Sequence, residues 1–221
     1  MSNNYLPTDY QAFIHTSRYA RWLEKENRRE TWPETVARYM SNVVSPIVSD
    51  LNVLDKIELN ILDLNVMPSM RAMMTAGPAL NRDHTAGYNC SYLPVDDPKA
   101  FDEAMYILLC GTGVGFSVER QYIQNLPEIP EMSESDTTVI VKDSKEGWAK
   151  GLRQVLALLW AGEIPKWDVS QIRPSGARLK TFGGRASGPA PLIDLFNFAV
   201  NTFKAASNRR LSSLECHDLM C

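Results

Sequence analysis

The stretch AFDEAMYILLCGTGVGFSVE, residues 100–119, constrains the fold most, because a helical pattern runs directly into a strand pattern. The helical part predicts a helix with Asp97 as N-cap and Pro98 at its first position, ending at Gly111. In the second part apolar residues alternate with small ones, as in a strand with one buried face. A helix joined so closely to a strand favours an α/β architecture.

Other segments continue this alternation of helices and strands. They are a mostly helical region over 10–60 with a capping box from Thr31 to Glu34, a strand over 136–142, a helix over 145–160 with a capping box from Asp143 to Glu146, a helix that Pro191 opens, and a last helix with a capping box from Ser212 to Glu215. Such an alternation favours parallel strands. The charged run EKENRRE, residues 24–30, is typical of a solvated helix end and turn.

The last helical pattern reaches Cys221 without the Gly, Pro or basic turn that usually ends a helix. About nine helical residues are too few to be stable alone. We therefore expect a truncated or split protein. The alternative is a short terminal helix that packs on the body of the fold.

Composition excludes several classes of function. Of the 221 residues, 44% are apolar and 22% charged, which is enough apolar content for a sizeable core. A net charge of −3 gives no reason to expect binding to nucleic acid or to an acidic membrane. The sequence has neither a signal peptide nor an apolar run of about 18 residues, so we expect a cytoplasmic protein.

The four cysteines form no C-x-x-C pair, and their spacing fits neither a zinc site nor a disulfide framework. Cys90 differs from an ordinary packing cysteine, because Asn89 and Ser91 place it in the polar stretch AGYNCSYLP. This frame is typical of a thiol that meets a substrate, with plain packing as the alternative. His84 lies near Cys90 in the sequence and is a weaker candidate for a base. No histidine has carboxylates at metal-ligand spacing, so no metal site is predicted.

Two glycine-rich loops are candidate ligand sites. GTGVGFS, residues 111–117, is neither a P-loop nor a dinucleotide fingerprint, and its alternating glycines allow close approach of a ligand or of another backbone. RPSGARLKTFGGRASGP, residues 173–189, combines four glycines with four cations, as a phosphate-binding loop does. Tight packing and a solvated surface loop are the respective alternatives.

Six segments, in this order, resemble one family: MPSMRAMMTAGPAL, GYNCSYLP, FDEAMYILLCGTGVGFSVE, DSKEGWAKGLRQ, RPSGARLKTFGGRASGP and LSSLECHDLMC. Together they resemble the N-terminal part of an adenosylcobalamin-dependent (class II) ribonucleotide reductase of the ribonucleoside-triphosphate type, over nearly the whole chain. The resemblance implies a ten-stranded α/β barrel. Residues 1–65 would be an N-terminal helical region, and residues 66–221 the first part of the barrel domain, truncated within a helix.

The resemblance also implies a reaction, in which a thiyl radical initiates reduction of the ribose 2′-hydroxyl and two cysteines supply the electrons. Cys90 would be one of this redox pair, with its partner and the thiyl cysteine beyond this chain. The implied substrate-binding residues are Asn89, Gly113, Met67 and Ser69, although Met67 stands where class I relatives carry a hydroxyl residue. The implied specificity loop, which relays the identity of a bound effector, includes Arg173, Gly176, Arg178, Lys180, Gly183 and Gly184. Cys110 and Cys216 match no catalytic position and are expected to be packing residues.

The implied partners are the C-terminal remainder of the reductase, a ribonucleotide substrate, a deoxynucleotide specificity effector and a thioredoxin-type reductant, in a bacterial or phage-infected cell. Adenosylcobalamin would contact mostly residues downstream of this chain. The chain alone is expected to be inactive and, with unpaired strand edges, poorly behaved. One alternative is a non-catalytic nucleotide-binding module derived from a reductase half-barrel. Another, a free-standing thiol oxidoreductase, is disfavoured because no C-x-x-C pair is present.

Overall fold

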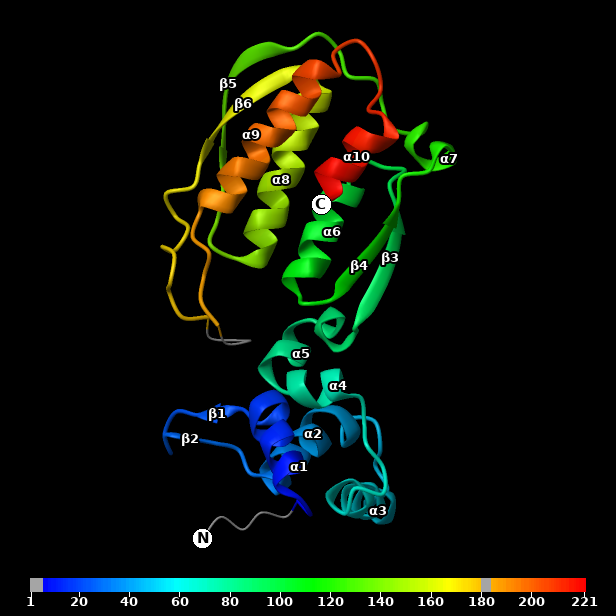
Figure 1. The fold of residues 1–221 in the computed structure, drawn as a ribbon, viewed down its shortest axis with the longest axis vertical. Coiled ribbons are helices and arrows are strands. Elements are labelled where there is room, and N and C mark those ends of the chain that lie inside the picture. The colour runs from blue at the N-terminus through cyan, green and yellow to red at the C-terminus, as the bar shows by residue number, and fades with distance from the viewer. Residues whose placement is uncertain (1–5, 180–183) are drawn as a thin grey trace. The chain divides into compact units, whose positions relative to one another are not determined.

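The computed structural model describes residues 6–179 and 184–221 (Figure 1). The chain divides into two compact units, unit 1 over Met1–Asn89 and unit 2 over Cys90–Cys221. The expected mixture of helices and strands is confirmed, and no helix among the described residues is both long and apolar enough to cross a membrane. The predicted domain division between residues 65 and 66 falls inside unit 1 and stays a prediction.

Unit 1 is mostly helical, as predicted for residues 10–60. Its elements are α1 (Asp9–Ile14), the π-helical turn η1 (His15–Tyr19), β1 (Trp22–Leu23), β2 (Arg28–Arg29), α2 (Trp32–Tyr39), the π-helical turn η2 (Met40–Val44), α3 (Leu51–Leu62), α4 (Met70–Thr75), α5 (Pro78–Arg82) and the 3-10 turn η3 (His84–Gly87). The predicted capping box of α2 is present, with Thr31 and Glu34 bonded to each other's backbone. A small apolar cluster forms the core: Leu6, Trp32, Val36, Met40, Ile61 and Met73.

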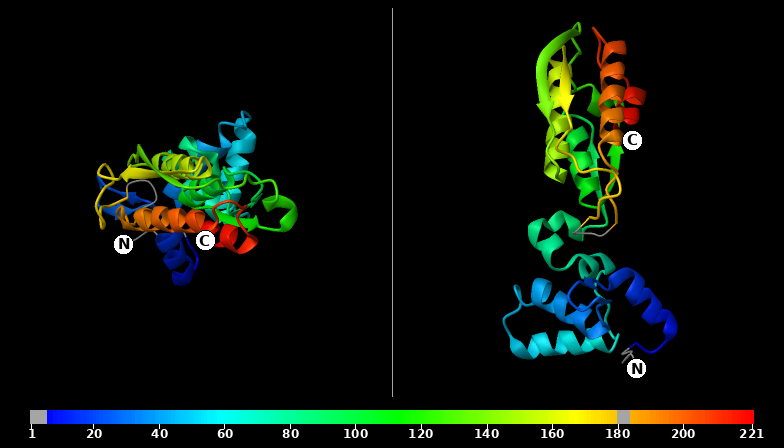
Figure 2. Two further views of the ribbon diagram at one scale, coloured as in Figure 1. Left: turned by 90° about the horizontal axis from the view of Figure 1, so that it is seen from above. Right: turned by 90° about the vertical axis from the view of Figure 1, so that its left-hand side faces the viewer.

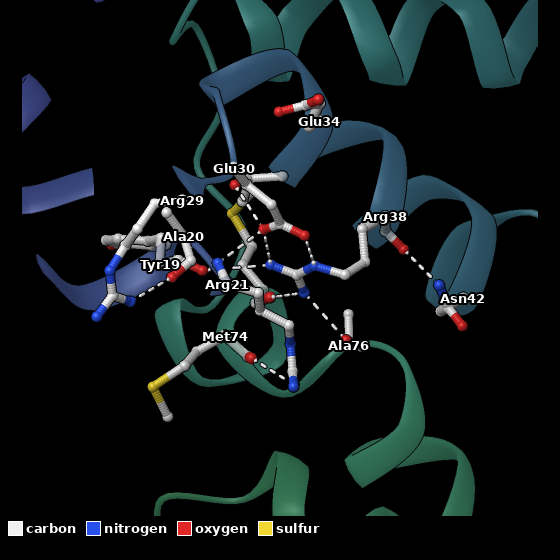
Figure 3. A network of polar contacts seen from close by, with 12 residues as sticks. Tyr19, Ala20, Arg21, Arg29, Glu30, Glu34, Arg38, Asn42, Met74 and Ala76 are labelled. Atoms are coloured by element: carbon white, nitrogen blue, oxygen red, sulfur yellow. Dashed lines mark hydrogen bonds and ion pairs between the residues drawn. The ribbon is translucent and has the colours of Figure 1, made fainter. Parts of the chain in front are cut away.

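A buried ion pair ties the helices of unit 1 together (Figure 3). Arg38 Nε lies 2.8 Å from Glu30 Oε1, and the two side chains are only 12% and 6% exposed. The Arg38 guanidinium also donates to the carbonyls of Met73 at 2.7 Å, Ala76 at 3.0 Å and Tyr19 at 3.2 Å. Arg38 thus joins α2 to the chain around α4 and to the end of η1.

The interpretation of EKENRRE as a solvated helix end and turn is confirmed for the exposed turn over 24–27, but no helix ends there and the last residue, Glu30, is buried. The segment contains the turn, with Asn27 at a φ of 52°, and the second strand of the antiparallel pair β1–β2. Glu30 then points inward, where it accepts hydrogen bonds from Arg38, from Thr35 Oγ1 at 3.1 Å and from the Arg21 amide at 3.0 Å. These donors compensate for the cost of burying a carboxylate.

Unit 2 alternates strands with helices. Its elements are β3 (Cys90–Pro94), α6 (Ala100–Leu109), β4 (Gly113–Ser117), α7 (Arg120–Ile123), β5 (Ser133–Ile140), α8 (Lys145–Trp160), β6 (Glu163–Asp168), α9 (Ala190–Ala205) and α10 (Ser213–Met220). The predicted parallel pairing is present twice, in β3–β4 and in β5–β6. In Figure 1, α6, α8 and α9 lie side by side between these two small sheets. The right-hand view of Figure 2 shows the arrows of the two sheets pointing in opposite directions.

A single apolar cluster holds unit 2 together. The helices contribute fully buried side chains such as Val155, Leu159, Phe196 and Phe203. Trp160 packs edge-on against Phe203, with ring centroids 4.8 Å apart. The predicted capping box from Ser212 to Glu215 begins α10. Here an Arg209 guanidinium bonded to Glu215 lowers the pKa of that carboxyl to about 2.

Two helix starts in unit 2 differ from the predictions. The helix predicted at Pro98 begins at Ala100, because Asp97 forms a turn in which its carboxylate accepts from the Lys99 amide at 2.8 Å. The capping box predicted at Asp143 is absent; Ser144 is the N-cap of α8 and accepts from the Gly147 amide. The predicted strand over 136–142 is shifted towards the N-terminus, as β5.

Candidate functional site

Cys90 and Gly113 lie side by side at the starts of the parallel strands β3 and β4. The pairing places Cys90 opposite Gly113 and Tyr92 opposite Gly115, and all four residues are exposed. The next residue, Ser91, donates its hydroxyl to the Gly113 carbonyl at 3.1 Å. The thiol of Cys90 is therefore held on regular backbone at the edge of an open face.

The β3–β4 pair has two unlike faces. Leu93 and Phe116 point to the side that packs on the core of unit 2. The face with Cys90 and Tyr92 carries glycines at both paired positions of β4, so β4 itself contributes no side chain at these positions. At Gly115 a Cβ atom would lie 3.6 Å from the Ser91 carbonyl oxygen, which is ordinary contact. Tight packing therefore does not require a glycine at position 115.

The other candidate substrate residues belong to unit 1. Asn89 is exposed and directly precedes Cys90 in the chain, and His84 is exposed in η3. The Ser69 hydroxyl caps α4 by accepting from the Ala72 amide at 3.5 Å. Met67 is 46% exposed and lines a cavity of about 310 Å³.

That cavity is mainly apolar, with one titratable ring in its wall. Its lining includes Ile14, His15, Tyr19 and Trp32 as well as Met67. His15 Nε2 lies 2.9 Å from Thr35 Oγ1, inside unit 1. Burial lowers the pKa of His15, although the nearby Glu30 carboxylate opposes this. The cavity suits a small apolar group and is too small for a corrin ring with its adenosyl group.

The basic loop after β6 forms a hairpin in its described part. The amide of Gly176 donates to the Ala186 carbonyl at 2.9 Å, and the amide of Leu179 to the Gly184 carbonyl at 3.0 Å. Gly176 and Gly184 have φ values of 86°, in the left-handed region that favours glycine. Two of the predicted loop residues, Lys180 and Gly183, lie outside the described residues.

The arginines of this hairpin have partners. Arg173 Nε donates to Asp143 Oδ2 at 2.7 Å, just before α8. The Arg185 guanidinium donates to the Gly176 carbonyl at 3.0 Å, across the hairpin. Arg178 pairs with Arg185 through a backbone bridge. Over its described residues the predicted basic loop is thus a paired hairpin, and Arg173 links it to Asp143 just before α8.

Three further cysteines differ in their surroundings. Cys110 and Cys216 are fully buried, as predicted for packing residues, and burial raises the pKa of Cys216 to about 12. Lys145 Nζ donates to Cys110 Sγ at 3.0 Å. The exposed Cys221 Sγ lies 3.7 Å from His217 Nε2. None of the described cysteines is in a disulfide, and no His, Cys, Asp and Glu side chains of the described residues cluster as metal ligands.

Sequence reasoning missed Asp143 and Lys145 as contacts of the basic hairpin and of a cysteine. The segment DSK, residues 143–145, precedes a clear helical pattern, and the sequence alone indicates only the cap of that helix. Figures 1 and 2 show that the start of α8 lies toward the same end of unit 2 as the starts of β3 and β4 and the described parts of the hairpin.

Comparison with known proteins gives this arrangement a family context. The family described as "B12-dependent ribonucleotide reductase, insertion domain" matches residues 120–203, a segment that includes the hairpin. A crystal structure of a B12-dependent (class II) ribonucleotide reductase superposes with a TM-score of 0.81 and 22% identity, over 95% of this chain and 39% of that one. The fold is therefore that of part of a class II reductase.

Sequence relatives agree with the structural match. An adenosylcobalamin-dependent ribonucleoside-triphosphate reductase of Lactobacillus helveticus is 24% identical over 91% of this chain and 37% of its own length. The corresponding enzyme of Lactobacillus leichmannii is 26% identical over 91% and 36%, and a putative one of Mycobacterium phage D29 is 26% identical over 82% and 31%. The chain is a homologue of the class II (B12-dependent) ribonucleotide reductases, and it spans only about a third of the length of these relatives.

Proposed function

We propose that this chain supplies part of the active site of a class II ribonucleotide reductase, which converts ribonucleoside triphosphates to deoxyribonucleotides. The observation that carries the proposal is the pairing of Cys90 with Gly113 at the exposed starts of β3 and β4. The thiol is accessible, and the neighbouring glycine lets a sugar approach the backbone closely. The names of the relatives supply the reaction class.

In this function β3 and β4 belong to the reductase barrel. Cys90 acts as one of the two thiols that together give two electrons to the ribose 2′-carbon. The 2′-hydroxyl leaves as water, and the two cysteines become a disulfide. The second cysteine and the radical-forming residues belong to the part of the relatives that this chain does not span. Asn89, Gly113, Met67 and Ser69 remain proposed substrate contacts.

The hairpin over residues 173–189 serves as the specificity loop in this proposal. Its cations suit a nucleotide phosphate, and its glycines allow the backbone to shift. The pair of Arg173 with Asp143 would then hold one end of the loop on α8 while a deoxynucleotide effector moves the rest. Adenosylcobalamin supplies the radical chemistry when bound, and because the unit 1 cavity does not fit it, no contact with it is assigned to the described residues.

Reconstitution tests the proposed role of Cys90. The chain is mixed with the part of the Lactobacillus leichmannii enzyme that it does not match, together with adenosylcobalamin, a ribonucleoside triphosphate and a dithiol reductant. Deoxynucleotide formation is then measured. We expect turnover in the mixture, its loss in Cys90→Ser, and its retention in the matched control Cys221→Ser. Turnover that survives in Cys90→Ser would refute the redox role.

A second candidate function is a non-catalytic nucleotide-binding module, which the paired basic hairpin favours. This module would bind deoxynucleotide through the hairpin and dock on a partner chain. Binding of a labelled deoxynucleotide that Arg173→Ala weakens, together with reconstituted turnover that does not depend on Cys90, would favour this module over the redox role.

A further inference from the structure

Cys110 and Lys145 meet where α6 ends and α8 begins. The Lys145 ammonium nitrogen lies 3.0 Å from Cys110 Sγ and 4.9 Å from the centre of the Tyr106 ring. Cys110 is 0% exposed, whereas Lys145 is half-buried at the first residue of α8. The proposed reductase function assigns neither residue a task.

The chemistry of this pair goes beyond packing. A cation beside a cysteine stabilises negative charge on the sulfur, which is the form that oxidants attack. Oxidised cysteine sulfur is known to condense with a nearby nitrogen. A direct sulfur–nitrogen bond would pull the two side chains well out of their positions. A single oxygen atom between them spans almost the separation that they already have.

We propose that Cys110 and Lys145 are the site of an oxidative cross-link, in which one oxygen atom bridges Cys110 Sγ and Lys145 Nζ. The oxidant is dioxygen. In the thiolate–ammonium form of the pair the sulfur carries no proton and the Lys145 ammonium loses two hydrogens, an S–O bond and an O–N bond form, and the O–O bond breaks. The second oxygen leaves with the two hydrogens as water. Four electrons pass from sulfur and nitrogen to dioxygen, so atoms and electrons balance.

The surroundings distinguish Cys110 from the other buried cysteine. Burial, and to a smaller extent the adjacent Glu215 carboxylate, raise the pKa of the other buried cysteine, Cys216, to about 12 and so keep its thiol protonated. The cross-link would join the C-cap of α6 to the first turn of α8. It would therefore fix the turn at Gly111 that leads into β4 and its Gly113.

Mass spectrometry tests the proposal directly. The chain is purified without oxygen, and one half is then exposed to air. We expect the air-exposed chain to gain about 14 Da, one oxygen less two hydrogens, and to lose that mass again in dithiothreitol. Trypsin should no longer cleave after Lys145, and the peptide with Cys110 should be attached to the one with Lys145.

Matched variants separate the cross-link from other oxidations. Lys145→Arg and Cys110→Ser should abolish the gain, while Lys150→Arg on the same helix and Cys216→Ser should keep it. The proposal is overturned if trypsin still cleaves fully after Lys145 in the air-exposed chain. It is equally overturned if Cys110 only gains two or three oxygens, or if the linked peptides persist in Lys145→Arg. Peptide mapping of the chain without substitutions shows whether Cys110 and Lys145 are linked, even where a variant fails to fold.

Discussion

Unit 1 and unit 2 are stabilised by different interactions. Unit 1 has a small apolar cluster, and its segments converge on the buried pair of Arg38 with Glu30. Unit 2 has a much larger continuous apolar core, and its ion pair of Arg153 with Asp102 joins a half-exposed arginine to a buried carboxylate beside that core. One chain thus combines a charge-centred unit, which is sensitive to loss of a single partner and to pH, with an apolar unit that is sensitive to loss of side-chain volume.

The largest expected effect is in the ion pair of unit 1. Arg38→Ala should destabilise unit 1 by about 4 kcal/mol, because it leaves the Glu30 carboxylate buried without its main donor. Hydrogen exchange measured by mass spectrometry should rise over residues 30–80 and stay unchanged over 150–205. The double variant Arg38→Met with Glu30→Leu is the matched control and should recover part of the loss. Equal loss in the double and single variants would contradict a charge-centred unit.

A somewhat smaller effect is expected in the core of unit 2. Leu159→Ala removes a fully buried side chain from α8 and should cost about 3 kcal/mol. Here the same exchange measurement should show the opposite distribution, with faster exchange over 150–205 and no change over 30–80. Leu158→Ala, at the half-buried neighbouring position, is the control and should cost much less. Faster exchange in both units would show that they do not unfold separately.

The smallest effect is that unit 1 should begin to lose stability at a higher pH than unit 2. Burial lowers the pKa of His15 below 6.5, so the unfolded state takes up a proton first and stability falls as pH drops below 6.5. For Glu30, burial would raise the pKa, but bonds from Arg38 and the Arg21 amide bring it below 4.5. Its contribution is therefore present above pH 4.5 and is lost as pH falls through the lower folded value.

Thermal unfolding, monitored by hydrogen exchange at a series of pH values between 7 and 3, checks this response. Unit 1 should lose protection before unit 2, beginning below pH 6.5. His15→Asn should remove the first part of the loss and leave the part below pH 4.5. A loss that begins in both units at the same pH would remove the distinction between them.

Local signals in the sequence predicted more of this fold than long-range ones did. The capping boxes at Thr31 and Ser212 follow from side chains three residues apart, and both are present. Glu30 was not predicted to be buried, because its partners include an arginine eight residues away that in turn reaches carbonyls 35 and 38 residues further on. No local pattern in a charged run indicates which of its side chains will be buried against such distant donors.

The candidate site shows the same limit. The polar frame around Cys90 predicted an accessible thiol, and the structure places it on an open face with Gly113 beside it. The role of Asp143 was misassigned because Asp and Ser are both good N-caps, and only the folded chain brings Arg173 to Asp143. Cofactor, substrate and effector were inferred from family resemblance, since neither periodicity nor charge specifies them.

The junction before α8 has a consequence for which changes the chain can tolerate. Asp143 contacts the hairpin, Ser144 caps the helix and Lys145 reaches Cys110, in three consecutive positions. Gly151 faces Val141, where an added Cβ would lie 2.9 Å from a methyl group. One residue inserted between Asp143 and Lys145 would rotate the helix by about 100° relative to the strand that precedes it. Insertions and deletions should therefore be absent here across orthologues, even where single positions vary in identity.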